Sequence, residues 1–152
     1  MSNKLIIILF CLLLQVNYNI KAQDQASDTS IYINKIEYYK NYISKHFDNT
    51  DSALSIALQG IRLAKAASDT TNLIKFYTHA GDLQKNQNNF DSAKKSYQKA
   101  LSLIRSADPQ KRKAKLRKKL GALDWKFSKY KKAAANFHEA LFLYQKNGNA
   151  LE

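Results

Sequence analysis

Two stretches of this chain decide its fold: HAGDLQKNQNNFDSAKKSYQKALSL, His79–Leu103, and KLGALDWKFSKYKKAAANFHEALFL, Lys119–Leu143. They align without a gap when Gly81 is set against Gly121, and the matches fall on small and apolar positions. A second shift of the same length finds a fainter N-terminal unit. A fixed period of this length indicates stacked supersecondary units. We therefore expect three repeats, at about 30–69, 70–109 and 110–149.

Each unit has the pattern of two helices, because apolar residues recur every three and four positions. Four glycines and one proline in 152 residues also favour long helices over a turn-rich β fold. Asn88 and Asn89 suit a turn and an N-cap, and Asp108 suits the N-cap of a helix that starts at Pro109. The predicted fold is an all-α, helical-hairpin solenoid. Its six helices should lie at about 30–47, 51–68, 71–87, 90–106, 109–127 and 130–146.

The two stretches resemble tetratricopeptide repeats (TPRs) in the order of their small and aromatic residues. The matching packing positions are Gly81, Phe90, Ala93, Tyr97 and Ala100 in the middle repeat, and Gly121, Tyr130, Ala133, Phe137 and Ala140 in the last. Small residues let paired helices approach, and aromatic rings fill the space beside them. We expect Gly81 and Gly121 to tolerate alanine but not a bulky side chain. The long period is similar to that of TPR-like repeats in bacterial regulators and in extracytoplasmic input regions of sensor proteins, and Arg117 replaces a large apolar residue of the family pattern.

The N-terminal residues have the features of a bacterial secretory signal peptide. Lys4 precedes an unbroken apolar run of ten residues, Leu5–Leu14, and a more polar segment follows it. Ten residues are too few to span a bilayer, which needs about 20. We expect cleavage after about residue 22, a flexible segment at 23–29, and a periplasmic or secreted solenoid at 30–152. The single cysteine, Cys11, would be removed with the signal.

The resemblance implies a non-enzymatic scaffold that binds a peptide or protein segment in a concave groove lined by the first helix of each repeat. A run of seven cations in nine residues, KRKAKLRKK at Lys111–Lys119, lies on one of these helices. It predicts an acidic peptide, an anionic polymer or a membrane surface as the partner, unless it is only a solvated helix face. The candidate partner-binding residues are Lys75, His79, Asp82, Lys115, Lys118, Lys119 and Trp125.

Other functions find no support in the sequence. It contains no nucleophile motif, phosphate-binding loop or metal-ligand spacing, so we expect no enzymatic activity, no metal and no cofactor. Nucleic acid is also not an expected partner, although the net charge is +13. Only four of the 25 cations are arginine, the residue that most often contacts bases and phosphates, and export would separate the chain from nucleic acid.

Two alternatives to the scaffold stay open at this point. The chain could be the extracytoplasmic input part of a larger signalling protein, or a basic module that binds anionic surfaces or polymers. In addition, apolar residues near the C-terminus leave a strip that we expect to be covered by a further repeat, by self-association of the C-terminal helix or by a partner. These residues are Phe137, Leu141, Phe142 and Tyr144.

Overall fold

The computed structural model describes residue 15, residues 28–106 and residues 108–146. Within the two long ranges the chain forms six helices and no strand, which confirms the predicted all-α hairpin solenoid. The first helix covers residues 28–45. The others are α2 (Thr50–Ala66), α3 (Thr70–Asn86), α4 (Phe90–Ser102), α5 (Gln110–Lys126) and α6 (Tyr130–Lys146). The predicted signal peptide falls outside the described residues, apart from residue 15, and so does the C-terminal end after residue 146.

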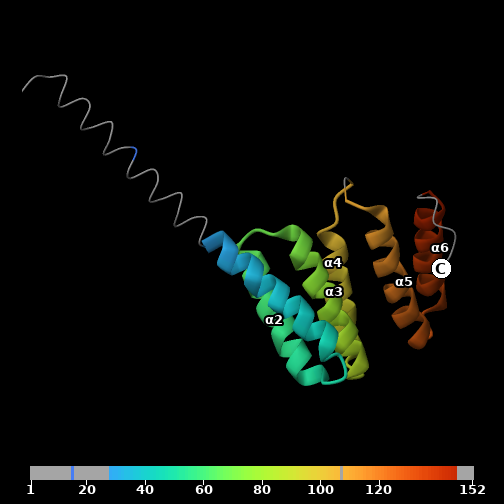
Figure 1. Ribbon diagram of the computed structural model, residues 1–152. Coiled ribbons are helices and arrows are strands. Elements are labelled where there is room, and N and C mark those ends of the chain that lie inside the picture. Colours follow the sequence, from blue (N-terminus) through green and yellow to red (C-terminus); the bar gives the residue numbers. More distant parts are fainter. Residues whose placement is uncertain (1–14, 16–27, 107, 147–152) are drawn as a thin grey trace, which may run out of the picture. The chain divides into compact units, whose positions relative to one another are not determined.

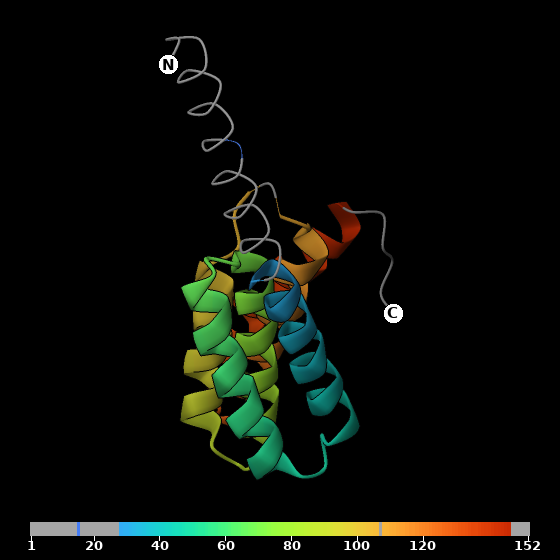
Figure 2. The same cartoon turned by 60° about the vertical axis from the view of Figure 1, so that its left-hand side comes forward.

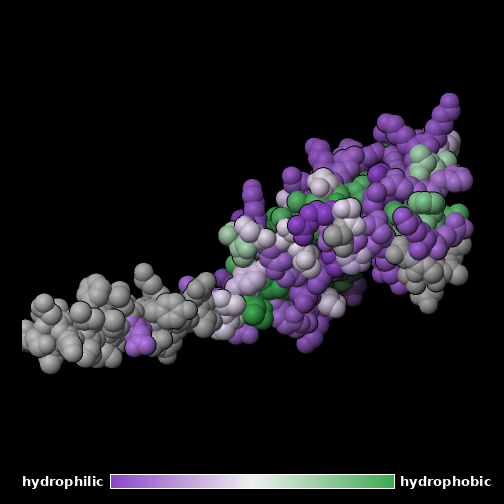
Figure 3. Space-filling view, turned by 90° about the horizontal axis from the view of Figure 1, so that it is seen from above, coloured by the Kyte–Doolittle hydropathy of each residue, from purple (hydrophilic) through white to green (hydrophobic). Residues whose placement is uncertain are grey.

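The described residues up to Tyr38 and those from Tyr39 onward form two compact units. In the second unit α2 to α6 follow one another as antiparallel neighbours, and each helix from α3 to α6 packs on the one before it (Figures 1 and 2). The contact between α4 and α5 is the least extensive of the four. No helix among the described residues combines the length and the apolar character needed to cross a membrane. In Figure 3 hydrophilic residues cover most of the visible helical surface, and hydrophobic residues show in narrow patches.

Three of the interhelix turns are built in the same way. Ser68, Asn88 and Ser128 occupy the left-handed region, with φ between 54° and 60°, and recur at half-repeat and full-repeat spacing. In each turn the next residue donates its backbone N–H to a carbonyl five positions earlier, as in Asn89 N to Gln84 O at 2.8 Å. Such a turn reverses the chain within a few positions, because the left-handed residue ends one helix just before the next begins. The predicted turn at Asn88 and Asn89 is confirmed, and the Asn89 side chain caps α4.

The connection between α4 and α5 differs from these turns and corrects two predictions. Helix α4 ends at Ser102 rather than near 106, since Leu103 and Ile104 leave the helix to pack on the hydrophobic core. Asp108 does not cap α5. Its carboxylate instead accepts the Arg105 N–H at 2.7 Å, and Pro109 takes the N-cap position. The residue before a proline is kept out of the helical region, which places the boundary here.

The three glycines in the described helices mark close helix contacts, and each faces an aromatic ring of the next helix. A Cβ on Gly60 would lie 2.5 Å from the Phe76 ring, one on Gly81 2.6 Å from Tyr97 Cδ1, and one on Gly121 2.8 Å from Phe137. Carbon atoms do not approach so closely, so even alanine must displace the ring. The expectation that alanine is tolerated is therefore wrong at Gly81, where the Tyr97 ring is fully buried. At Gly121 the Phe137 ring is partly exposed and can move, so tolerance of alanine stays a prediction there.

The remaining packing positions separate into buried and exposed groups. Ala93, Tyr97, Ala100, Ala133 and Ala140 are buried, and Phe90 is half-buried against Phe127 of the following hairpin, with ring centroids 5.8 Å apart. Tyr130, the residue equivalent to Phe90, is 56% exposed and touches only the edge of the Trp125 ring among the described aromatic residues. Phe137 and Phe142 of α6 are 38% and 62% exposed. The strip predicted near the C-terminus is thus partly open, although Leu143 is buried.

Candidate functional site

The basic run on α5 divides into several faces because a helix distributes neighbouring residues around its axis. Leu116, Leu120 and Leu123 form the predicted apolar seam and are all buried. Lys115 and Lys119 lie on the side toward α3, whereas Lys113 and Arg117 face α6 and pair with Glu139. Lys111 and Lys118 are exposed. The cations of the run therefore lie on two different sides of α5, and some of them are exposed to solvent.

The first site is the surface shared by α3 and α5, which we call the α3–α5 face. It carries Lys75, His79 and Asp82 from α3, and Lys115, Lys119 and Ala122 from α5, at positions that the repeat alignment makes equivalent. The link between the two helices is an ion pair of 2.5 Å from Lys119 Nζ to Asp82 Oδ1. The hydroxyl of Tyr97, on α4, donates to the same Asp82 oxygen at 2.7 Å.

The groups on this face influence one another's ionisation. Burial lowers the pKa of His79 below its usual 6.5, the Asp82 carboxylate opposes this shift, and the nearby Lys119 and Lys75 reinforce it. Burial also raises the pKa of Tyr97 far above its usual value, and its hydrogen bond to Asp82 acts in the same direction. His79 is therefore largely neutral near pH 7, and Tyr97 keeps its proton. The face holds three lysines, of which Asp82 pairs with one.

Of the other predicted partner-binding residues, Lys118 and Trp125 lie farther along the exposed side of α5. Lys118, Ala122 and Trp125 follow the helical spacing of three and four residues, so they continue the α3–α5 face toward the end of the helix. Trp125 is 61% exposed and packs edge-on against Tyr130, with ring centroids 5.1 Å apart. The structure thus places two exposed aromatic rings beyond the lysines.

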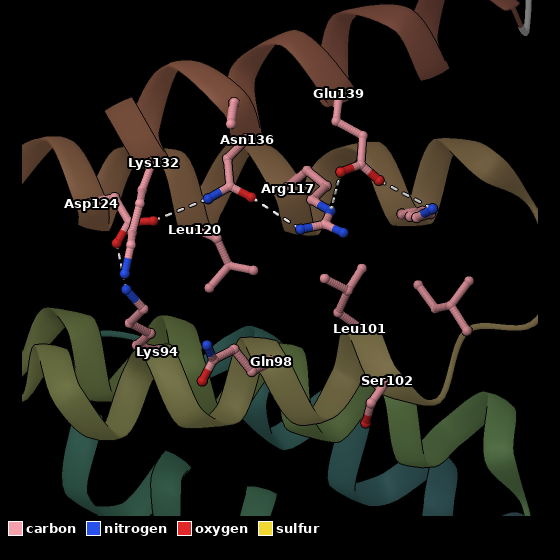
Figure 4. A pocket seen from close by; sticks show the side chains of 13 residues that line it. Lys94, Gln98, Leu101, Ser102, Arg117, Leu120, Asp124, Lys132, Asn136 and Glu139 are labelled. Carbon is pink, nitrogen blue, oxygen red and sulfur yellow. Dashed lines mark hydrogen bonds and ion pairs between the residues drawn. The ribbon is translucent and has the colours of Figure 1, made fainter. Parts of the chain in front are cut away.

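The second site is a pocket of about 830 Å³ between α4, α5 and α6, which was not predicted from the sequence. Figure 4 shows a chain of polar side chains along it. At one end Lys94 of α4 pairs with Asp124 of α5, and Asn136 of α6 donates to Asp124 at 3.0 Å. Arg117 then donates from its terminal nitrogen to Asn136 at 3.2 Å.

At the other end of the pocket, two cations share the carboxylate of Glu139. Lys113 lies 3.1 Å from Glu139 Oε1, and Arg117 Nε lies 2.9 Å from Oε2 without the alignment of a hydrogen bond. Leu101 and Leu120 lie between the two ends and supply an apolar floor (Figure 4). Asp124 is only 3% exposed, and a buried carboxylate requires such partners. A network of polar side chains therefore lines the pocket.

The alignment of the repeats held a signal for this pocket. Lys94, Lys113 and Arg117 stand where the preceding repeat has Leu54, Leu73 and Tyr77. Charged residues at three positions that are apolar one repeat earlier indicate a role other than core packing. Whether they meet in space depends on the packing of three helices, which the alignment does not contain.

The described residues contain no group of three metal-ligating side chains that could hold an ion. Comparison with known proteins found no family model that matches the chain and no curated protein with significant sequence similarity.

Proposed function

We propose that this protein is an exported, non-enzymatic scaffold of the TPR-like type that binds an acidic segment of another protein on its α3–α5 face. The observation that carries the proposal is the ion pair between Lys119 of α5 and Asp82 of α3, with Lys75 and Lys119 both acting on the half-buried His79. Lys115 lies one helical turn before Lys119 on α5 and adds a third cation to this face. An extended acidic segment can pair with Lys75 and Lys115, the two lysines of this face that do not pair with Asp82. Electrostatic complementarity of this kind gives specificity and fast association.

The aromatic rings of Trp125 and Tyr130 extend this binding surface. Exposed aromatic side chains are enriched where proteins bind one another, because they bury a large area at low entropic cost. Their place beyond Lys118 favours a partner in which an apolar or aromatic residue follows the acidic ones. The half-buried His79 adds a second test, since a carboxylate bound beside it would favour its protonated form.

A photo-crosslinking amino acid at Ala122 tests the proposal directly. Ala122 is exposed and lies between Lys118 and Trp125, so a crosslinker there should capture the partner in living cells. The same residue at Lys95, which is exposed on α4, is the matched control and should capture much less. Replacing Lys75 and Lys115 by Gln should then reduce the Ala122 product. Equal products at both positions, or no effect of the lysine substitutions, would contradict the proposal.

The alternative basic module makes a different prediction in the same system. Binding to an anionic membrane or polymer depends on the number of cations rather than on their arrangement, and it weakens steeply with salt. Removal of Lys95 and Lys131, which are exposed on α4 and α6 and pair with no acid among the described residues, should then matter as much as removal of Lys75 and Lys115. If the partner binds on the α3–α5 face, removal of the two pairs of lysines should have different effects.

Export of the protein is tested separately. Mass spectrometry of the N-terminus of the native protein should find a start near residue 23 if the signal peptide is removed.

A further inference from the structure

We propose that the pocket between α4, α5 and α6 binds an organic dianion whose two carboxylates are joined by an apolar spacer. The pocket has two polar ends. The Asp124 end consists of Asp124, Lys94 and Lys132, and the Glu139 end consists of Glu139, Lys113 and Arg117. Each end therefore has two cations and one carboxylate, which leaves one positive charge at each end for a ligand.

At the Asp124 end, Lys132 is the cation that can pair with a carboxylate of the ligand. Lys132 extends from α6 toward the Lys94–Asp124 pair (Figure 4), and in the part of the chain that the structure describes it pairs with no carboxylate itself. Lys94 and Asn136 already satisfy the Asp124 carboxylate. The spare charge at this end is consequently carried by Lys132, on the exposed side of the pocket.

The Glu139 end offers a forked donor. Arg117 spans Glu139 and Asn136, while its Nε has no aligned hydrogen-bond acceptor. Lys113 is about one-third exposed, and its ammonium lies on the same carboxylate. Guanidinium groups bind carboxylates through two parallel hydrogen bonds, so Arg117 can exchange or share its present partner with an incoming carboxylate.

The length and character of the spacer follow from the helices. Arg117 and Asp124 are seven positions apart on α5, and so are Lys132 and Glu139 on α6. At about 1.5 Å per residue the two ends are about 10 Å apart. Leu101 and Leu120 line the space between them, so an apolar spacer would be buried there. The volume of about 830 Å³ is within the usual range for small-molecule sites.

The cost of building the pocket supports a binding role. The preceding repeat places Leu54, Leu73 and Tyr77 at the positions of Lys94, Lys113 and Arg117. Half-buried charges at such positions are at best neutral for stability compared with apolar residues of similar volume. Three charges that converge on one pocket are therefore better explained by a ligand than by the needs of the fold.

Isothermal titration of the full chain at low salt tests the proposal with defined probes. Suberate should bind about tenfold more tightly than octanoate, which has one carboxylate, and than succinate, whose carboxylates cannot reach both ends. A blocked peptide with two glutamates separated by two leucines presents the same chemistry from a protein source. Tighter binding of suberate would identify a free acid, and tighter binding of the peptide would identify a protein segment. If neither exceeds octanoate, the proposal is wrong.

Two substitutions with matched controls locate the binding. Lys132→Gln and Lys113→Gln should each lower suberate affinity about tenfold and remove its advantage over octanoate. Lys131→Gln and Lys111→Gln remove the same charge from exposed neighbours outside the pocket and should leave the affinity within about twofold. Equal losses in both pairs would show a general charge effect and would overturn the proposal.

Discussion

The hairpins α3–α4 and α5–α6 carry equivalent side chains one repeat apart, yet they use them for different purposes. In the first, Gly81 receives the fully buried ring of Tyr97, and the Gln84 amide lies 2.7 Å from the Ser96 hydroxyl. In the second, Gly121 receives a ring that is 38% exposed. Asp124 and Asn136 replace the neutral Gln84–Ser96 pair and need Lys94 as a counter-charge.

The same helical hairpin therefore carries a packed core in α3–α4 and lines a polar pocket in α5–α6. The α3–α4 hairpin is covered by α5 and uses its repeat positions for packing, as the fully buried Tyr97 shows. The α5–α6 hairpin is less enclosed, and its equivalent positions carry charges that meet at a pocket. We therefore expect substitutions at the buried repeat positions of α3–α4 to change stability most, and substitutions at the equivalent positions of α5–α6 to change binding more than folding.

The largest effect should come from the aromatic ring of the buried repeat. Tyr97→Ala should lower the free energy of unfolding by about 3–5 kcal/mol, because it opens a cavity and removes one of the two side-chain donors to Asp82, leaving Lys119 as the other. Phe137→Ala, at the equivalent position, should cost only about 1–2 kcal/mol because the ring is partly in solvent. Urea denaturation measures both. Phe142→Ala, an exposed control, should stay within about 0.5 kcal/mol. Equal costs for Tyr97 and Phe137 would remove the proposed contrast between the hairpins.

The buried ion pair should give the next largest effect. Lys94→Met leaves Asp124 buried with Asn136 as its one remaining partner among the described residues, which should cost about 2–3 kcal/mol. Adding Asp124→Asn removes the uncompensated charge and should restore most of the loss. Ser96→Ala, which disturbs the equivalent neutral pair in α3–α4, should cost no more than about 1 kcal/mol. A double variant no more stable than Lys94→Met would show that charge is not the cause.

The glycine contacts should separate the two hairpins by a smaller amount. Gly81→Ala should destabilise by about 1–2 kcal/mol, since the Tyr97 ring is buried and its hydroxyl is held by Asp82. Gly121→Ala should come within about 0.5 kcal/mol of the parent, because the partly exposed Phe137 can move and alanine favours the helix. Thermal melts of the two variants check this order. Ala122→Gly, which costs helix propensity alone, provides the scale.

The smallest effect should be a pH dependence that arises from His79. Its pKa lies below 6.5 in the folded chain, so the unfolded chain takes up the proton first as the pH falls. The fold should therefore lose stability below about pH 6.5 and stop losing it below the folded pKa. His79→Gln should flatten this slope. An NMR titration of the imidazole measures the pKa directly, and a value at or above 6.5 would contradict the burial of this side chain.

Much of the fold was accessible from the sequence, for reasons visible in single residues. The repeat of small and aromatic positions placed all six helices within a few residues, except at the end of α4. There Leu103 and Ile104 leave the helix for the core, a choice made by packing rather than by helix propensity. Gly60 was missed because the next repeat has no glycine at the equivalent position, although it contacts Phe76 as closely as the other two glycines contact their rings.

The candidate sites were less accessible. Lys115 and Lys119 were predicted because they lie in an obvious basic run, and Asp82 because it lies on the first helix of its repeat. Lys94, Asp124 and Glu139 carry no motif. They became a site only when three helices brought them within ion-pair distance of their partners.

The sequence by itself determined the helices, their pairing into hairpins and two of the three close glycine contacts, those of Gly81 and Gly121. It could do so because helix propensity, turn chemistry and the spacing of small residues act over a few residues or at a fixed period. Only the tertiary structure decided which cations work together. Lys113 and Lys115 are two positions apart, but one faces Glu139 of α6 and the other lies on the α3 side. The rotation of about 100° per residue around a helix separates neighbours in the chain, and packing chooses their new neighbours in space.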